Sequence, residues 1–189
     1  MTLLEYLQTI PDFRRKQGRR YPLEVLLLIT IMSIMSGRCG YREIAAFAKA
    51  NQREFLRYFH LKRKTLASHV TFREVIKGVD FDEVITAFNQ WASRSLTIEP
   101  GEWFSVDGKA LGSTVTESDS AYQNFVSLVS VFSHKRGQVA GVAALENLKS
   151  SEIPTVQDLI DTLGLQGLVF TLDALHCQKN GQGHCGERQ

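Results

Sequence analysis

Two aspartates in the second half of the chain have the setting that metal-dependent phosphodiester chemistry needs. Asp107 follows the apolar run Trp103–Val106, and Asp173 lies at the end of the run Leu168–Leu172. Carboxylate oxygens are hard ligands that match Mg²⁺ or Mn²⁺. Two such ions can activate the attacking oxygen and stabilise the departing oxygen at a phosphodiester. If the fold brings these side chains together, the pair indicates nuclease or strand-transfer chemistry.

The elements predicted beyond Pro100-Gly101 place the two aspartates on neighbouring strands. Their order is β-β-β-α-β, with strands at Trp103–Val106, Phe125–Phe132, Val139–Leu145 and Leu168–Leu172 and a helix at Ile153–Leu163. Short connections, including a turn at residues 134–136, favour an antiparallel meander for the first three strands. The helical crossover then lays the fourth strand parallel to the first, about 4.8 Å away if they are neighbours. Asp107 and Asp173, 66 positions apart in the sequence, would then form a carboxylate pair at one sheet edge.

Spacing alone leaves simpler interpretations open. An isolated Asp at the end of a strand is more often a turn former or a helix cap than a metal ligand. The pairs His176-Cys177 and His184-Cys185 offer four soft ligands, but their spacing matches no familiar zinc pattern. No zinc site is therefore expected.

The sequence of the first half of the chain predicts a series of helices. Helices are predicted at Thr2–Gln8, Leu23–Ser36 and Tyr41–His60, then from Thr71 with a Thr71–Glu74 capping box, and from Asp80 or Asp82 to about Leu96. The Leu23–Ser36 run is apolar on nearly every face, as expected for a central core helix rather than a membrane span, because only 13 of its residues form the apolar stretch. These patterns predict an α+β chain with a helical domain over residues 1–98.

The charge is divided unevenly along the chain. Residues 1–95 carry 16 Lys or Arg and 9 Asp or Glu, whereas the remainder carries 6 and 11, although the net charge of the whole is only +2. Such asymmetry indicates a segment that binds a polyanion, with nucleic acid as the expected partner. The candidate DNA-binding residues are Arg14, Arg15, Lys16, Arg19, Arg20, His69 and Arg73. A solvated basic linker remains the alternative for the first five.

Composition excludes several classes of protein. An apolar share of 43% with 22% charged residues is ordinary for a globular protein and argues against disorder or a fibrous repeat. Three cysteines without a framework spacing fit a reducing cytosol, so we expect a cytoplasmic protein with no membrane partner.

Seven segments together resemble the DDE-type insertion-sequence transposases of the H-repeat-associated (ISAs-type) group. They are residues 10–12 (IPD), 18–23 (GRRYPL), 40–45 (GYREIA), 68–72 (SHVTF), 106–109 (VDGK), 151–154 (SEIP) and 172–179 (LDALHCQK). The resemblance implies a helical associated domain followed by a ribonuclease-H-like catalytic domain at residues 99–179, which cuts and joins DNA at element ends with Mg²⁺ or Mn²⁺. It also implies that Asp107 and Asp173 are the first two acids of the Asp-Asp-Glu triad.

The sequence departs from this pattern after Lys179. The family continues into a further helix and strand with the third acid well downstream, whereas residues 180–189 (NGQGHCGERQ) have no aliphatic or aromatic residue. We expect this stretch to be a disordered tail outside the family pattern and Glu187 not to be the third ligand. The expectation is therefore a C-terminally truncated, inactive transposase fragment with weak or no metal binding. The alternative is a non-catalytic DNA-binding module, or one that interacts with itself or with a full-length transposase.

Overall fold

The computed structural model describes residues 1–96, 99–111, 114, 125–146, 152–164 and 167–171. The chain splits into two compact units, Met1–Phe88 (unit 1) and Asn89–Gln189 (unit 2). The division falls within helix α6 (Phe81–Ser95), which runs through both units. The domain boundaries predicted at residues 98 and 179 stay predictions.

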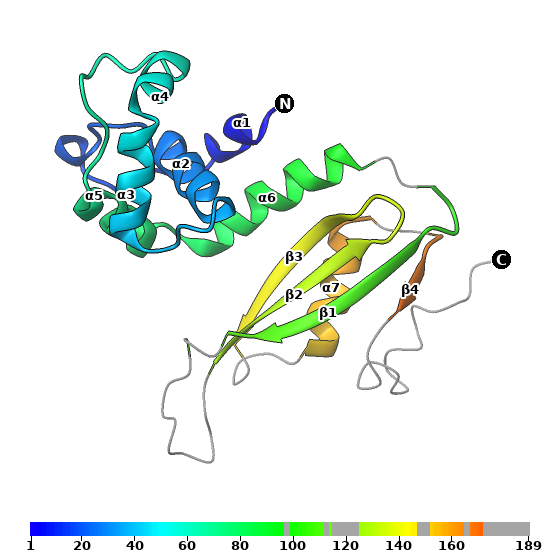
Figure 1. The fold of residues 1–189 in the computed structure, drawn as a ribbon. Helices are drawn as coiled ribbons and strands as arrows, with labels where there is room; N and C mark the ends of the chain where they lie inside the picture. Colours follow the sequence, from blue (N-terminus) through cyan, green and yellow to red (C-terminus); the bar gives the residue numbers. More distant parts are fainter. Residues whose placement is uncertain (97–98, 112–113, 115–124, 147–151, 165–166, 172–189) are drawn as a thin grey trace. The chain divides into compact units, whose positions relative to one another are not determined.

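Unit 1 is helical in its described elements (Figure 1). It contains α1 (Leu3–Leu7), a short 3₁₀ helix η1 (Lys16–Gly18), α2 (Leu23–Met35), α3 (Tyr41–Ala50), α4 (Gln52–Tyr58), α5 (His69–Gly78) and the first part of α6. The prediction of a central helix from Leu23 is confirmed, since Leu26 and Ile29 of α2 are completely buried. In the described part of the chain, no helix is long and apolar enough to cross a membrane.

The single helix predicted over Tyr41–His60 is wrong, because the structure has α3 and α4 there, separated at Asn51. The backbone of Asn51 leaves the helical region at φ −103° and ψ 17°, and its side-chain amide donates to the Phe47 carbonyl at 2.9 Å. A local hydrogen bond of this kind competes with helix continuation. The Phe47 and Phe55 rings still meet at 5.9 Å. Because the spacing of the apolar residues continues across the break, the periodicity of the sequence could not reveal that the helix ends at Asn51.

The start predicted for the next helix is also wrong. Helix α5 begins at His69, with Ser68 at the N-cap position, so Thr71 lies inside the helix and does not form a capping box with Glu74. Two residues of N-cap type, Ser68 and Thr71, stand three positions apart, and the first of them ends the preceding extended segment at φ −78° and ψ 166°. The predicted cap of the following helix is confirmed at Asp80, which accepts from the Asp82 amide at 3.0 Å.

Unit 2 contains a four-stranded mixed sheet. The strands are β1 (Trp103–Ala110), β2 (Val126–Ser133), β3 (Gln138–Glu146) and β4 (Val169–Thr171), and their spatial order is β3-β2-β1-β4. The antiparallel meander of β1, β2 and β3 and the parallel pairing of β4 with β1 are both confirmed. The predicted turn at residues 134–136 joins β2 to β3, and Gly137 closes it at φ +65°.

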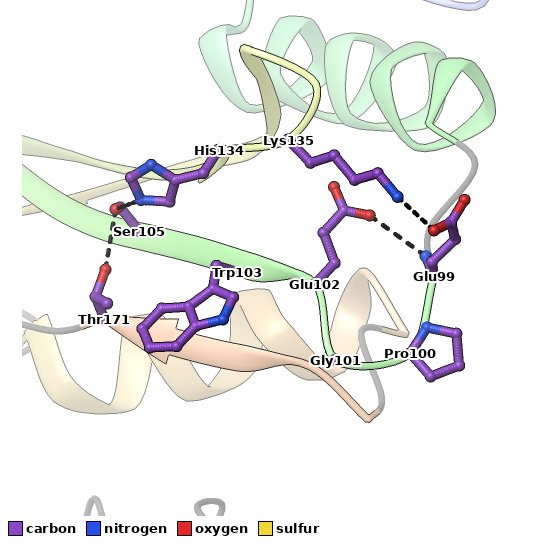
Figure 2. A pocket seen from close by; sticks show the side chains of 9 residues that line it. All are labelled: Glu99, Pro100, Gly101, Glu102, Trp103, Ser105, His134, Lys135 and Thr171. Carbon is purple, nitrogen blue, oxygen red and sulfur yellow. Dashed lines mark hydrogen bonds and ion pairs between the residues drawn. The ribbon is translucent and has the colours of Figure 1, made fainter.

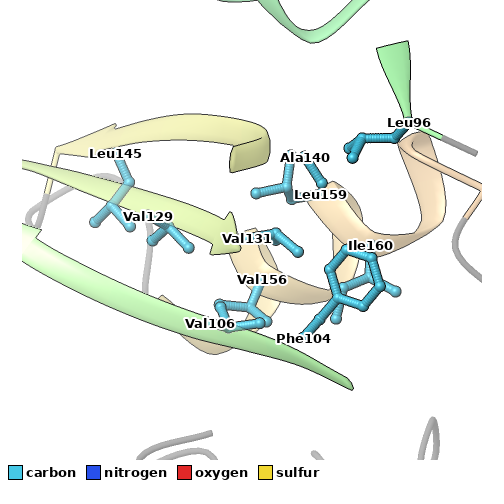
Figure 3. Packing of buried hydrophobic residues seen from close by; sticks show 10 residues of the cluster. All are labelled: Leu96, Phe104, Val106, Val129, Val131, Ala140, Leu145, Val156, Leu159 and Ile160. Carbon is cyan, nitrogen blue, oxygen red and sulfur yellow. The ribbon is translucent and has the colours of Figure 1, made fainter. Parts of the chain in front are cut away.

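Helix α7 (Glu152–Thr162) covers one face of this sheet (Figure 3). The buried cluster between them is Leu96, Phe104, Val106, Val129, Val131, Ala140, Leu145, Val156, Leu159 and Ile160. A Cβ at Gly141 would lie 2.6 Å from Leu163 Cδ1, so glycine lets the end of α7 approach β3 closely. The molecule is therefore a mixed α+β protein, with helices in unit 1 and a helix-covered sheet in unit 2.

Candidate functional site

Strand β1 divides its side chains between the two faces of the sheet. Phe104 and Val106 are buried against α7, whereas Ser105 and Asp107 alternate with them and lie on the opposite face. The strand continues to Ala110 instead of ending at Val106 as predicted, because β2 pairs with it along Phe104–Ala110. Asp107 therefore lies inside β1, with an exposed carboxylate.

The described pairing of β1 with β4 has one constant offset. Trp103, Phe104 and Ser105 pair with Val169, Phe170 and Thr171, each 66 residues further along the chain. Side chains support this register, because the hydroxyl oxygens of Ser105 and Thr171 lie 2.9 Å apart. Asp173, the second predicted catalytic and metal-binding residue, lies outside the described residues.

The surroundings of Asp107 suit a hard cation in ligand type. Asp107 pairs across the strands with Ser130 of β2, and Ser105 precedes it on the same face, so oxygen donors lie near it. The exposed Lys109 also lies near it, two residues further on. Among the described residues, no group of three or more His, Cys, Asp or Glu side chains is placed to hold a metal ion. The other acids and soft ligands considered from the sequence, Glu187 and the two His-Cys pairs, lie outside the described residues.

Two of the predicted DNA-binding arginines hold their own loop together. Arg14, whose side chain is only 9% exposed, donates to both carboxylate oxygens of Asp12 at 2.9 Å and to the Tyr21 carbonyl at 2.9 Å. Arg19 donates to the backbone carbonyls of Asp12 and Arg14, each at 2.7 Å. The Arg14 hydrogen bond holds the pKa of Asp12 below its ordinary value, against the opposing effect of burial. Both guanidinium groups are thus engaged within residues 12–21.

The other three basic residues of this loop face solvent. Arg15, Lys16 and Arg20 are exposed, and the loop that carries them is tied to residues 63–65. Tyr21 donates to the Thr65 carbonyl at 3.0 Å, and Arg63 donates to the Arg20 carbonyl at 3.2 Å while lying over the Tyr21 ring. This contact brings the segment that carries the exposed Lys62 and Lys64 next to the loop of the first group. We call the exposed cations of the two segments the cationic surface.

Helix α5 presents a basic stripe. His69 and Arg73 are exposed and one turn apart, while Phe72 and Val75 are buried on the inner side. Arg73 also pairs with Glu74 at 2.7 Å. The same four-residue spacing adds Lys77, an exposed residue that was not selected from the sequence. A cavity of about 350 Å³ beside the start of α5 is lined by His69 and Lys49, among other residues.

A second cavity, of about 710 Å³, lies in unit 2 and was not predicted from the sequence (Figure 2). It is lined by Glu99, Pro100, Gly101, Glu102, Trp103, Ser105, His134, Lys135 and Thr171. Ser105 hydrogen-bonds both Thr171 and Nε2 of His134. The strand alternation that puts Trp103 and Ser105 on one face was visible in the sequence, but the approach of the β2–β3 turn was not.

Both carboxylates of this cavity are engaged. The hydrogen bond from Lys135 holds the pKa of Glu99 below its ordinary value, and the hydrogen bond from Ser133 does the same for Glu102. Glu102 accepts from the Ser133 hydroxyl at 2.6 Å and from the Glu99 amide at 3.3 Å. Glu102 therefore fastens the entry of β1 to the end of β2.

Comparisons with known proteins find transposases. Residues 4–92 match the family model described as DDE_Tnp_1-associated. "Putative transposase YncI" of Escherichia coli O157:H7 is 27% identical over 179 residues, which are 95% of this chain and 45% of that protein. Its namesake from strain K12 is 26% identical over 95% of this chain and 71% of its own length.

"H repeat-associated putative transposase YhhI" of strain K12 is 26% identical over 94% of this chain and 46% of its own length. The chain thus spans about half the length of YhhI and of the O157:H7 relative. No solved structure matches it.

Proposed function

We propose that this chain, which is similar to H-repeat-associated transposases and matches the DDE_Tnp_1-associated model over residues 4–92, handles the DNA ends of an insertion sequence. The intact family would cut and join those ends by metal-dependent phosphodiester chemistry. With this function, the protein would act in the cytoplasm, where the insertion-sequence DNA is. Further copies of the chain, or a full-length transposase, are proposed as additional partners.

The register between β1 and β4 is the observation that carries the proposal. Every described pair is offset by 66 residues, and the same offset relates Asp107 to Asp173. If the pairing continues for two more residues, the two aspartates lie side by side on the sheet face opposite α7. The connectivity of the strands and α7 likewise supports a ribonuclease-H-like arrangement for unit 2.

In this arrangement Asp107 and Asp173 would hold Mg²⁺ or Mn²⁺, and a pair of such ions would supply activation of the attacking oxygen and stabilisation of the departing one. The family's catalytic triad consists of three acids, and the matching motifs of this chain supply two of them, Asp107 and Asp173. We therefore propose that the 189 residues alone bind metal weakly and do not cleave DNA robustly. The two carboxylates would supply the metal ligands on one side of the site.

The cationic surface of unit 1 supports DNA as the partner. Arg15, Lys16 and Arg20 extend into solvent from a loop that Arg14 and Arg19 fix in place. Exposed cations on one loop can neutralise several phosphates, which makes DNA binding depend on salt. The basic stripe of α5, with His69 and Arg73, is proposed as a second DNA contact.

A non-catalytic module is the second candidate function. It is favoured because the exposed cations of the cationic surface all lie in unit 1, whereas Asp107 lies in unit 2. Such a module would occupy element ends or contact a full-length transposase without cutting DNA.

A nicking and binding assay on labelled element-end DNA separates the two candidates. Metal-dependent nicking that is lost in Asp107→Ala would favour the enzyme, even if the activity is low. Salt-dependent binding that is unchanged by Asp107→Ala and by EDTA, without any nicking, would favour the module. For either one, replacing Arg15, Lys16 and Arg20 with alanine should reduce the slope of log affinity against log salt by about 2 to 3. Binding that is independent of salt and of these residues would contradict both.

A further inference from the structure

The cavity of unit 2 continues directly from the proposed metal site. Ser105 belongs to the cavity lining, and Asp107 lies two residues further along β1 on the same face of the sheet. Two residues of strand span about 7 Å. A nucleic-acid strand whose phosphate lies at Asp107 can therefore reach the cavity with a base of the same or the adjoining nucleotide.

One wall of the cavity offers a flat aromatic surface. The side chain of Trp103 is 55% exposed, although it lies next to Phe104, which is completely buried. Figure 2 shows the indole lying along the cavity beside β4, where its ring is not covered by the other labelled side chains. Aromatic rings exposed in this way are platforms on which bases stack, because every base has a π face.

The inner end of the cavity offers hydrogen bonds to the edge of a ring. Ser105 and Thr171 present hydroxyl groups 2.9 Å apart. Thr171 donates its proton to the Phe104 carbonyl at 3.3 Å, so its oxygen is left as an acceptor, whereas the Ser105 hydroxyl can donate or accept. His134 joins them through Nε2, so Nδ1 is not part of this network. Because Trp103 and Ser105 lie on the same face of β1, a ring stacked on the indole has its edge within reach of these groups.

The charges of the cavity favour a neutral ring over a phosphate. Glu99 and Glu102 bring two negative charges, and Glu99 is paired with Lys135 and lies 3.8 Å from Arg136. The cations are therefore balanced by carboxylates, and a phosphate group inside the cavity would face both acids. A base is uncharged and carries donors and acceptors on its edge, which matches this lining.

We propose that this cavity accepts an unpaired base of the DNA strand whose phosphate lies at the Asp107 site. The proposal rests on the proposed function for its choice of DNA as ligand. Trp103 stacks on the face of the base, and Ser105, Thr171 and His134 bind its edge. Taking a base out of the duplex costs stacking energy, so the cavity selects DNA that is already unpaired or frayed at this position.

The test compares a blunt element-end duplex with the same duplex carrying a single-stranded tail of three nucleotides. Fluorescence anisotropy measures both affinities, and 2-aminopurine at the first unpaired position reports stacking by its quenching. We expect the chain to bind the tailed duplex at least about fivefold more tightly, which is the lower end of the effect of one stacking platform. The Trp103→Ala variant should lose this preference and the quenching, whereas Trp91→Phe, a matched change outside the cavity, should keep both.

Two further variants separate stacking from edge recognition. Trp103→Phe should retain part of the preference for the tail, because phenylalanine still offers a ring face. Ser105→Ala combined with Thr171→Ala leaves the indole in place and should weaken tail binding by about fivefold to tenfold. Thermal melting followed by circular dichroism checks that each variant folds. Because Trp103 is largely exposed, Trp103→Ala should fold normally.

The outcomes distinguish failure of this inference from failure of the proposed function. Equal binding of both duplexes, or a preference that survives Trp103→Ala, overturns the base site while DNA binding stands. Such a result would leave the exposed indole as a contact for another protein chain. Absence of binding to either duplex overturns the DNA function itself and this proposal with it.

Discussion

At the scale of single residues, neighbouring arginines divide structural and functional work. The Arg14 side chain is mostly covered and bonded to Asp12 and Tyr21, whereas Arg15 next to it is exposed. The sequence presents both as members of one basic run, and only the fold separates them. Charge counting therefore predicted a basic segment correctly but could not say which of its members are available to DNA.

This division predicts opposite effects of two adjacent alanine substitutions. Arg14→Ala should lower the free energy of unfolding by about 2 to 3 kcal/mol, because Asp12 loses a charge-assisted bidentate partner in a mostly buried setting. Arg15→Ala should change stability by less than about 0.5 kcal/mol and instead weaken DNA binding. Urea unfolding and DNA titration of both variants measure these effects, and equal destabilisation by the two would refute the division.

The same ion pair predicts how stability depends on pH. Arg14 lowers the pKa of Asp12 below 3.8, so near that pH the folded chain binds fewer protons than the unfolded chain. The resulting stabilisation is complete above about pH 4 to 5 and is lost as the pH falls through the lowered pKa of the folded state. Acid titration of Asp12→Asn should show a smaller loss of stability between pH 5 and about pH 2 than the unaltered chain. An identical acid profile would argue that Asp12 does not contribute.

At the scale of elements, an asparagine protects the edge strand of the sheet. Asn89 of α6 donates to the Val142 carbonyl and accepts from the Val142 amide, each at 2.8 Å. Because β3 is an edge strand, this residue satisfies backbone groups that would otherwise be open to another strand. The contact lies entirely within unit 2.

Removing this contact should weaken unit 2 selectively. Asn89→Ala leaves two backbone groups of β3 without their partner and should cost about 1 to 3 kcal/mol, although alanine favours the helix. Gln90→Ala is the matched control, since Gln90 is exposed on the same helix. Hydrogen exchange at the Val142 amide should rise in the first variant and not in the second. Unchanged exchange in Asn89→Ala would show that water replaces the contact without loss.

Element prediction succeeded where side-chain alternation or burial dominates and failed where a local polar group decides. The strand order and the parallel pairing of β4 with β1 followed from short apolar runs and connection lengths. The break at Asn51 did not, because its side chain bonds the Phe47 carbonyl without changing the apolar period. The start of α5 at His69 did not, because Ser68 and Thr71 are both residues of N-cap type and the sequence does not choose between them. The extension of β1 beyond Val106 depends on its partner β2, which is a tertiary effect.

At the scale of the whole molecule, the candidate site depends on contacts that span long stretches of sequence. The aspartates themselves could be selected from strand positions and the family resemblance. The cavity beside them could not, because it is assembled from residues 99–105, the β2–β3 turn and Thr171. In the proposed function the two units would share the handling of DNA. The exposed cations of unit 1 would contact phosphates, and the sheet of unit 2 would present Asp107 to one strand.

The most direct test of the central claim is a disulfide cross-link between the two aspartate positions. Asp107→Cys and Asp173→Cys are combined in a chain whose Cys39, Cys177 and Cys185 are replaced by serine. Neighbouring strands bring Cα atoms within the 4.4 to 6.8 Å that a disulfide typically spans. Mass spectrometry of the oxidised protein should therefore recover the peptide pair joined through residues 107 and 173. The control pair, Asp107→Cys with Asp158→Cys on the exposed side of α7, should not cross-link. A 107–173 yield no higher than that of the control would contradict the carboxylate pair on which the account depends.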